Sequence, residues 1–419
     1  MLRITPLRDG EYLLSAVAAG VEDYYMGARE APGVWAGRFA GTLGLAGVVE
    51  AADLRALVEG RDPATGVDLL AGRPPRKNNC YDLTLSAPKS ASVLWAFATP
   101  EVASVVARTH VEATEVALGF LEDRAAVARQ QVAGVRRALI TGGWAAATFV
   151  HRTSRAGDPQ LHTHALVANL VRRADGTHVA MEGTAMHEWA KAAGCLYQEE
   201  LRRRLTERLG VVWGPDRNGC REMVGFSDSQ LARFSKRSAQ IEAWLQAHGA
   251  RYESPVARMR ADEAASLATR PAKDPGLTPE ALRESWAAEA AGVGLGGPEA
   301  VEAAVCGRAV PQPAPGFDEV VAALVDAESG LCARDSRFGE AQVVERIAAA
   351  GAGRLGVAEV TRLARAFLAT DHVVRLAEPP STGRARSARW STAAHRAMED
   401  RVLGHLGALV SRPGPGLDP

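Results

Sequence analysis

Residues 151–170, HRTSRAGDPQLHTHALVANL, decide the fold, because this stretch predicts a β-hairpin that carries three histidines. The run Ala-Gly-Asp-Pro at 156–159 marks the turn between the two arms. On a strand, His162 and His164 point to the same face, because successive side chains alternate. Folding about the turn places His151 roughly opposite His162, with Cβ atoms about 5 Å apart. Three converging imidazoles are typical of a catalytic metal site with open positions. An ordinary polar face of a sheet is the competing interpretation.

The length and composition of the chain limit its class. With 419 residues, we expect two or three domains. The 49 basic and 49 acidic side chains cancel, so nucleic-acid binding would have to come from local patches rather than from global charge. Five scattered cysteines without a Cys-x-x-Cys pair indicate a reducing compartment. No signal peptide and no apolar run of membrane-spanning length is present, so we expect a cytoplasmic protein without membrane insertion.

The first part of the chain predicts a mixture of strands and helices. Residues 81–86 alternate cleanly, with Tyr81 and Leu83 on one face and Asp82 and Thr84 on the other, which indicates a half-buried strand with a polar face. The other predicted elements are a strand at 1–7, helices at 9–25, 50–59, 90–129, 191–209 and 226–248, and loops at 29–47 and 72–79.

The composition changes after about residue 294, which indicates a second unit. The sequence VPQPAPG at 310–316 is typical of a linker. A helix at 357–369, a strand at 372–377, a basic loop at 379–387 and a helix at 392–409 together resemble a winged-helix module. We therefore expect a domain at 1–295, a linker at 296–316, a winged-helix-like domain at 317–410 and an unordered tail at 411–419.

Two further residue types could act with a metal. Tyr24 and Tyr25 are adjacent, and a phenol becomes a nucleophile when a metal or base assists it. One buried and one surface tyrosine at a helix end is the alternative interpretation. Asp82 could orient a ligating histidine through its second nitrogen, or accept the proton of the phenol. Clusters of Arg and Lys flank the hairpin, which suits contacts with phosphates. The absence of a GxxxxGK[ST] motif gives no reason to expect ATP use.

Several separate blocks, in order, resemble one family. They are DYYMG, WAGRFAGTLGLAG, YDLTLSAPKSASVLWA, the histidine stretch, WGPDRNGCREMVGF and FSKRSAQIEAWL. Together they resemble the MobF-type relaxases of conjugative plasmids, the TraI and TrwC kind, over residues 1–295. The resemblance implies an α/β fold of the palm-like HUH type, a two-layer sandwich whose central antiparallel sheet carries the histidine cluster.

The resemblance also implies an activity and its partners. Such proteins nick and rejoin single-stranded or hairpin DNA at an origin of transfer through a 5′-phosphotyrosine intermediate, assisted by a divalent metal ion. Here His151, His162 and His164 would hold the ion, and Asp82 matches the family's carboxylate. Imidazole ligands favour Zn, Mn, Ni or Co over Mg, although the family is usually described as working with Mg or Mn. The expected DNA contacts are Arg76, Lys77, Lys89, Arg152 and Arg155.

Two departures from the family pattern matter. Only one tyrosine cluster is present, and we rank the nucleophile as Tyr24, then Tyr25, then Tyr12. The chain also lacks the helicase P-loop, and its C-terminal unit resembles the beginning of that helicase region. The expected partners are therefore accessory relaxosome proteins, a coupling protein and a separate helicase. The expected location is the donor cytoplasm, with export attached to DNA.

Three other functions compete with this interpretation. A rolling-circle replication initiator shares the tyrosine and His-x-His chemistry, but His151 and the SAPKS block favour the conjugative type. A non-catalytic autoregulator that binds its own origin would explain the missing tyrosine cluster. A metal hydrolase for small substrates explains the histidines, but neither the basic clusters nor the tyrosine pair.

Overall fold

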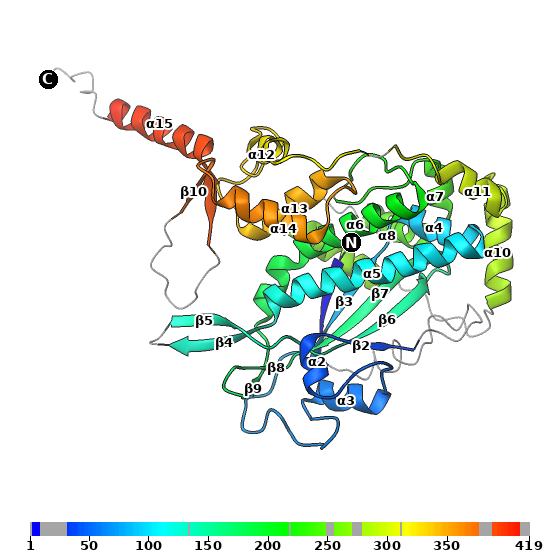
Figure 1. Ribbon diagram of the computed structural model, residues 1–419, viewed down its shortest axis with the longest axis horizontal. Coiled ribbons are helices and arrows are strands. Elements are labelled where there is room, and N and C mark those ends of the chain that lie inside the picture. The colour runs from blue at the N-terminus through cyan, green and yellow to red at the C-terminus, as the bar shows by residue number, and fades with distance from the viewer. Residues whose placement is uncertain are drawn as a thin grey trace.

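A five-stranded antiparallel sheet forms the centre of the molecule, in the order β1-β3-β7-β6-β2. The computed structural model describes residues 2–8, 32–132, 135–217, 219–248, 255–269, 279–310, 312–376 and 388–410. The strands of the sheet are β1 (Leu2–Leu7), β2 (Val34–Ala36), β3 (Cys80–Ser86), β6 (Ala146–Thr153) and β7 (Pro159–Ala168). Helices cover the sheet, so the predicted two-layer α/β fold with a central antiparallel sheet is confirmed (Figure 1).

The hairpin of β6 and β7 has the predicted register. His151 lies directly opposite His162, and the ladder continues to Ala146 opposite Val167. The turn depends on Gly157, which adopts φ 75°, a left-handed conformation that glycine reaches without strain. The Ser154 hydroxyl accepts the N–H of Asp158 at 3.1 Å and closes the turn. The predicted turn therefore sets the relative position of the two arms.

One face of the sheet packs against α4 (Lys89–Phe97), α5 (Pro100–Ala125) and α6 (Gly183–Leu209). The odd-numbered residues of β3 and β7, among them Leu83 and Val167, are fully buried in this layer. Burying each such side chain stabilises the fold by about 1.5–3 kcal/mol. Figure 1 shows α5 and α6 running across the sheet, with α13 (Glu340–Gly351) and α14 (Val357–Leu368) stacked beyond α6.

The prediction of a single helix at 90–129 is wrong. The structure has two helices that are separated at Ala98 and Thr99, followed by a strand pair, β4 (Val127–Val132) and β5 (Val135–Ile140). Pro100 causes the break, because proline has no N–H to donate and favours the first turn of a new helix. The helix predicted at 226–248 is likewise divided, into α7 (Asp228–Arg233) and α8 (Lys236–Ala247).

On the opposite face of the sheet, α2 (Arg38–Thr42) and α3 (Ala51–Glu59) cover one end. Phe39 and Leu54 pack there against Phe149 of β6 and Leu166 of β7. The loop predicted at 29–47 is therefore wrong where β2 and α2 form. Both elements are short, and β2 forms by pairing with β6, which no local pattern in the sequence indicates.

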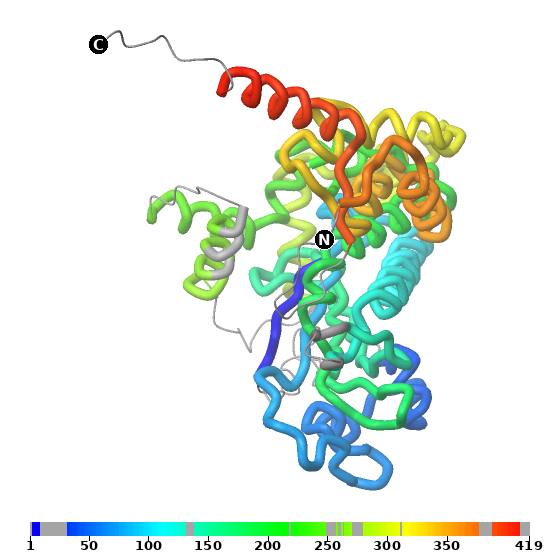
Figure 2. Tube along the Cα trace, turned by 90° about the vertical axis from the view of Figure 1, so that its left-hand side faces the viewer, coloured from blue at the N-terminus to red at the C-terminus, as the bar shows by residue number. Residues whose placement is uncertain are grey.

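Two short strands, β8 (Val171–Arg172) and β9 (His178–Val179), precede α6. After α8 the chain forms α9 (Pro255–Ala268), α10 (Pro279–Gly292) and α11 (Pro298–Val305). α8 and α9 pack together in an arm that stands out from the body (Figure 2). α11 falls inside the segment expected to be a linker, and its Val301 and Val305 are buried in the main core, so that part of 296–316 is packed structure.

The C-terminal elements are α12 (Phe317–Val325), α13, α14, β10 (Val373–Arg375), β11 (Trp390–Thr392) and α15 (Ala393–Val410). Helices α12–α14 share the core that contains Leu196 and Leu201 of α6, whereas α15 extends away from the body (Figures 1 and 2). The domain boundaries and the winged-helix character of this unit stay predictions. Among the residues that the structure describes, no helix has the length and apolarity that a membrane crossing needs.

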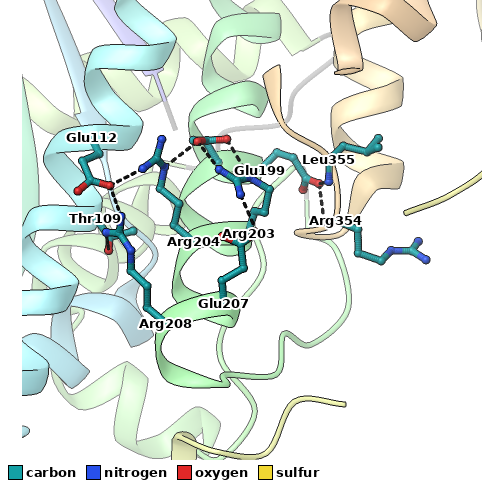
Figure 3. Close-up of polar contacts among 10 residues, drawn as sticks. Thr109, Glu112, Glu199, Arg203, Arg204, Glu207, Arg208, Arg354 and Leu355 are labelled. Carbon is teal, nitrogen blue, oxygen red and sulfur yellow. Dashed lines mark hydrogen bonds and ion pairs between the residues drawn. The ribbon is translucent and has the colours of Figure 1, made fainter. Parts of the chain in front are cut away.

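A buried carboxylate joins α6 to the C-terminal unit. Glu199, 1 % exposed, accepts the backbone N–H group of Gly353 at 2.6 Å. It also accepts the backbone N–H groups of Arg354 and Leu355 at 3.0 Å each (Figure 3). Successive N–H groups that point at one spot form an anion-binding concavity. The guanidinium of Arg202, itself fully buried, donates to the same carboxylate at 3.1 Å. The α13–α14 turn is thus fixed on α6.

Candidate metal centre

The three histidines converge on the sheet face opposite to the one that packs against α4, α5 and α6. One ring nitrogen from each of His151, His162 and His164 lies within 4.8 Å of the others. The ring centroids are 5.0–5.2 Å apart. His151 and His162 are buried, and His164 is partly exposed. The structure therefore confirms that the three histidine side chains converge, as strand alternation and hairpin register predict.

Asp82 fixes the orientation of His164. Both residues point to the same face, from the neighbouring strands β3 and β7, and Nδ1 of His164 donates to the Asp82 carboxylate at 2.8 and 3.0 Å. The proton is therefore on Nδ1 and the lone pair on Nε2. Of the two roles that the sequence left open for Asp82, this geometry supplies the orientation of a histidine.

His162 is oriented in a similar way. Its Nδ1 lies 3.0 Å from the carbonyl oxygen of Gln160. Because a carbonyl can only accept, Nδ1 carries the proton and Nε2 carries the lone pair. Three imidazoles, two of them with a fixed tautomer, form a donor set that fits a divalent transition-metal ion with open coordination positions.

The turn of the histidine hairpin is anchored from three sides. The amine of Lys89 donates to the carbonyl of Pro159 at 2.8 Å, and the Trp286 indole donates to the carbonyl of Gly157 at 2.6 Å. Asp158 accepts the backbone N–H of Lys236 at 2.9 Å. Burial lowers the pKa of Lys89 to about 8 and raises the pKa of Asp158. These contacts hold the end of the hairpin that lies next to His151 and His162.

The residues expected to contact DNA have different surroundings. Arg76 donates to the backbone carbonyls of Val58, Asn79 and Asn169 at 2.7, 3.3 and 3.2 Å, and burial lowers its pKa. Lys77 is exposed and lines a cavity of about 470 Å³ beside Arg73 and Arg129. Arg152 and Arg155, on β6 and in the turn, are partly exposed. The Lys89 amine donates its hydrogen bond to the carbonyl of Pro159.

The candidate nucleophiles Tyr12, Tyr24 and Tyr25 lie outside the described residues, as does the helix predicted at 9–25.

Sequence reasoning missed a polar group behind the histidines. Thr163 lies between His162 and His164, and its side chain points to the helix-covered face, where it meets His110 of α5. His110 in turn meets Tyr197 of α6. Alternation along β7 indicates the direction in which the Thr163 side chain points. No local pattern indicates its partner, because His110 lies 53 residues before Thr163 in the sequence and 87 residues before Tyr197.

Comparisons with known proteins agree with this geometry. Residues 8–293 match the model of the TrwC relaxase family. The multifunctional conjugation protein TraI of Escherichia coli is 32 % identical over 265 residues, which is 60 % of this chain and 14 % of TraI, so the chain matches a small part of that relative's length.

Solved structures of the conjugative relaxase TrwC also resemble this chain. A metal-bound structure of the conjugative relaxase TrwC in complex with oriT DNA has a TM-score of 0.61 and 30 % identity, covering 71 % of this chain and 99 % of that chain. A copper-bound TrwC structure with oriT DNA has the same values. With the family model matching most of the chain and the fold and histidine geometry in place, the chain belongs to the TrwC relaxase family.

Proposed function

We propose that this chain nicks and rejoins one DNA strand at an origin of transfer, for conjugative transfer of plasmid DNA. The observation that carries the proposal is the convergence of three imidazoles within 4.8 Å, with Asp82 on the outer nitrogen of His164. Membership of the TrwC relaxase family supports it, and the TrwC structures that resemble this fold are complexes with oriT DNA.

His151, His162 and His164 would hold a divalent ion, and Asp82 would keep His164 in the tautomer that a ligand needs. The ion supplies positive charge next to the scissile phosphate, where negative charge builds up in the transition state. Mg or Mn is the ion that we expect in use, and Zn, Ni or Co would also suit three imidazoles. The copper-bound TrwC structure supports a site that accepts transition metals in that protein.

The nucleophile would be the phenol of Tyr24, with Tyr25 and then Tyr12 as the next choices. The phenol loses its proton, and its oxygen forms a bond to phosphorus while the bond from phosphorus to the 3′-oxygen breaks. The 3′-oxygen leaves with a proton as a hydroxyl, and the 5′-phosphate stays on the tyrosine. Because one phosphodiester replaces another, the reverse reaction rejoins the strand without an added energy source.

The DNA contacts that we propose are Lys77, Arg152 and Arg155, with Arg76 and Lys89 holding the backbone around them. The partners would be the hairpin and single strand at the origin, relaxosome proteins, a coupling protein and a separate helicase. The protein would act in the donor cytoplasm and leave it attached to DNA. Residues 1–295 would carry the strand-transfer activity, and 317–410 would form a second, winged-helix-like unit.

A covalent-adduct assay tests the proposal. Overlapping single-stranded oligonucleotides that tile both strands of the DNA flanking the gene are incubated with protein and Mg or Mn, resolved on a denaturing gel and mapped by peptide mass spectrometry. We expect one oligonucleotide to give an adduct on Tyr24 or Tyr25. Chelation and His162→Ala should abolish it, and His187→Ala, at an exposed histidine outside the cluster, should not.

Two results would overturn the proposal. Tight binding of one oligonucleotide without an adduct in any divalent ion would identify a non-catalytic origin-binding protein. An adduct at a site that supports plasmid replication but not mobilisation would identify a rolling-circle initiator.

A further inference from the structure

A chain of three buried polar side chains connects the helical layer to the histidine strand. Nε2 of His110 on α5 lies 2.8 Å from the hydroxyl of Thr163 on β7, and Nδ1 of His110 lies 2.8 Å from the hydroxyl of Tyr197 on α6. The three residues are at most 1 % exposed. The rings of His110 and Tyr197 meet edge-on at 87°. The chain therefore ties two helices to one point of the sheet.

That point is the residue between two candidate metal ligands. Thr163 pairs with Leu85 of β3 and Val150 of β6, so it sits in the middle of the sheet. Its neighbours along β7, His162 and His164, point to the opposite face, and their Cα positions follow that of Thr163. Any displacement of Thr163 along or away from the sheet therefore moves both histidines.

Hydrogen bonds fix the position of Thr163 more narrowly than the surrounding apolar contacts, because hydrogen bonds are directional and apolar contacts are not. Burial lowers the pKa of His110 to about 3, so its ring is neutral, with one donor nitrogen and one acceptor nitrogen. Burial also raises the pKa of Tyr197, which keeps its hydroxyl protonated. Each member can then satisfy the next, and a shift of β7 that broke one bond would leave buried polar groups without partners, which is costly in a low-dielectric core.

We propose that Thr163 and His110 are positioning residues for the metal centre, which set the place of His162 and His164 through β7 from the opposite face of the sheet. This inference rests on the metal site of the proposed function. A merely structural role would lower the stability of the protein. A positioning role also changes the affinity and the geometry of the bound ion while the protein is fully folded.

Cobalt(II) alone is the probe, because its visible absorption reports both binding and ligand geometry. Thr163→Val keeps the shape of the side chain and removes the hydroxyl, Thr163→Ser restores a hydroxyl, and Tyr197→Phe removes the far end of the chain while keeping the ring. Thr114→Val is the matched control, because Thr114 is a buried threonine of α5 (2 % exposed) whose hydroxyl makes no hydrogen bond within the described structure.

At a temperature where circular dichroism shows every variant folded, we expect Thr163→Val to weaken cobalt binding roughly tenfold, as loss of an orienting contact does in metalloproteins, and to shift the absorption band. Thr163→Ser should restore both, Tyr197→Phe should change them in the same direction by less, and Thr114→Val should match the wild type. If Thr163→Val does not fold, Tyr197→Phe and its cobalt spectrum decide the question.

The failures of the two proposals are distinguishable. Wild-type protein without a cobalt band that depends on His162 would contradict the metal site itself, and this inference with it. A wild-type band that Thr163→Val and Tyr197→Phe leave unchanged in position and affinity would overturn only the positioning role.

Discussion

The Asp82 carboxylate lies 2.8 Å from Nδ1 of His164, although the two residues are 82 positions apart in the chain. The contact exists because β3 and β7 pair directly in the central sheet. A carboxylate on the outer nitrogen raises the basicity of an imidazole ligand and fixes its ring. Asp82 thus acts on the proposed metal site through His164.

Asp82→Asn should therefore weaken the binding of Mn or Co by about 10- to 100-fold, the range found when an orienting partner of a metal ligand is lost. The amide can still accept a hydrogen bond, so the fold should persist. Titration of the metal by calorimetry measures the effect. Asp335→Asn, at an exposed carboxylate, is the control, and equal affinities for the two variants would refute the orienting role.

Glu199→Gln should lower the free energy of unfolding by about 3–5 kcal/mol, because it leaves the buried charge of Arg202 without its partner. The amide also presents a donor to backbone N–H groups that need an acceptor. Urea denaturation measures the loss. Glu207→Gln, on the same helix but 56 % exposed, should cost less than about 1 kcal/mol. Similar losses for both would mean that the buried contact adds nothing beyond a surface ion pair.

His110 should make stability depend on pH. Its folded pKa of about 3 lies below the ordinary histidine value of 6.5, so on acidification the unfolded chain takes up a proton before the folded protein does. Stability should then fall as the pH drops from about 6.5 towards 3, by at most about 1.4 kcal/mol per pH unit from this residue. Urea titrations between pH 7 and 4 should show a shallower slope for His110→Gln than for the wild type. A slope that His110→Gln does not alter would show that this ring takes up its proton over the same pH range in the folded and unfolded protein, which contradicts a lowered folded pKa.

Lys77 and Lys89 should differ in their effect on DNA binding. Lys77 is exposed, whereas the Lys89 amine donates to the carbonyl of Pro159. With the oligonucleotide that forms the adduct, in a Tyr24→Phe/Tyr25→Phe background, Lys77→Ala should reduce the slope of log K against log salt by about 0.7, the value for one phosphate contact on a single strand. Lys89→Ala should leave the slope unchanged and lower the melting temperature. The reverse pattern would place Lys89, and not Lys77, on DNA.

The convergence of the three histidines could be predicted from the sequence because its geometry depends on local rules. Strand alternation puts His162 and His164 on one face, and the Gly157 turn fixes the register that brings His151 opposite His162. The alternation of β3 placed Asp82 on the polar face by the same reasoning. Each of these inferences needs only a few adjacent residues.

Other features depend on contacts between distant segments, for which one sequence carries no signal. β2 has three residues and exists because β6 pairs with it. The bonds from His110 to Thr163 and Tyr197 join three elements whose order in space follows from the whole fold. α11 was not predicted, because the Pro- and Gly-rich composition around it is typical of a linker. Pro298 nevertheless lies in the first turn of this helix, a position that proline favours.

The order of the strands in the sheet has a consequence for biosynthesis. Leu2 of β1 pairs with Leu85, and Val34 of β2 accepts a hydrogen bond from Thr148, 114 residues later. The ribosome therefore delivers both outer strands before either inner partner exists, and the sheet cannot assemble in the order of translation. Until the central hairpin emerges, the nascent chain exposes strand edges that could pair with other molecules. Pro6, which lacks an N–H, and the charge of Arg3 make β1 a poor template for such pairing.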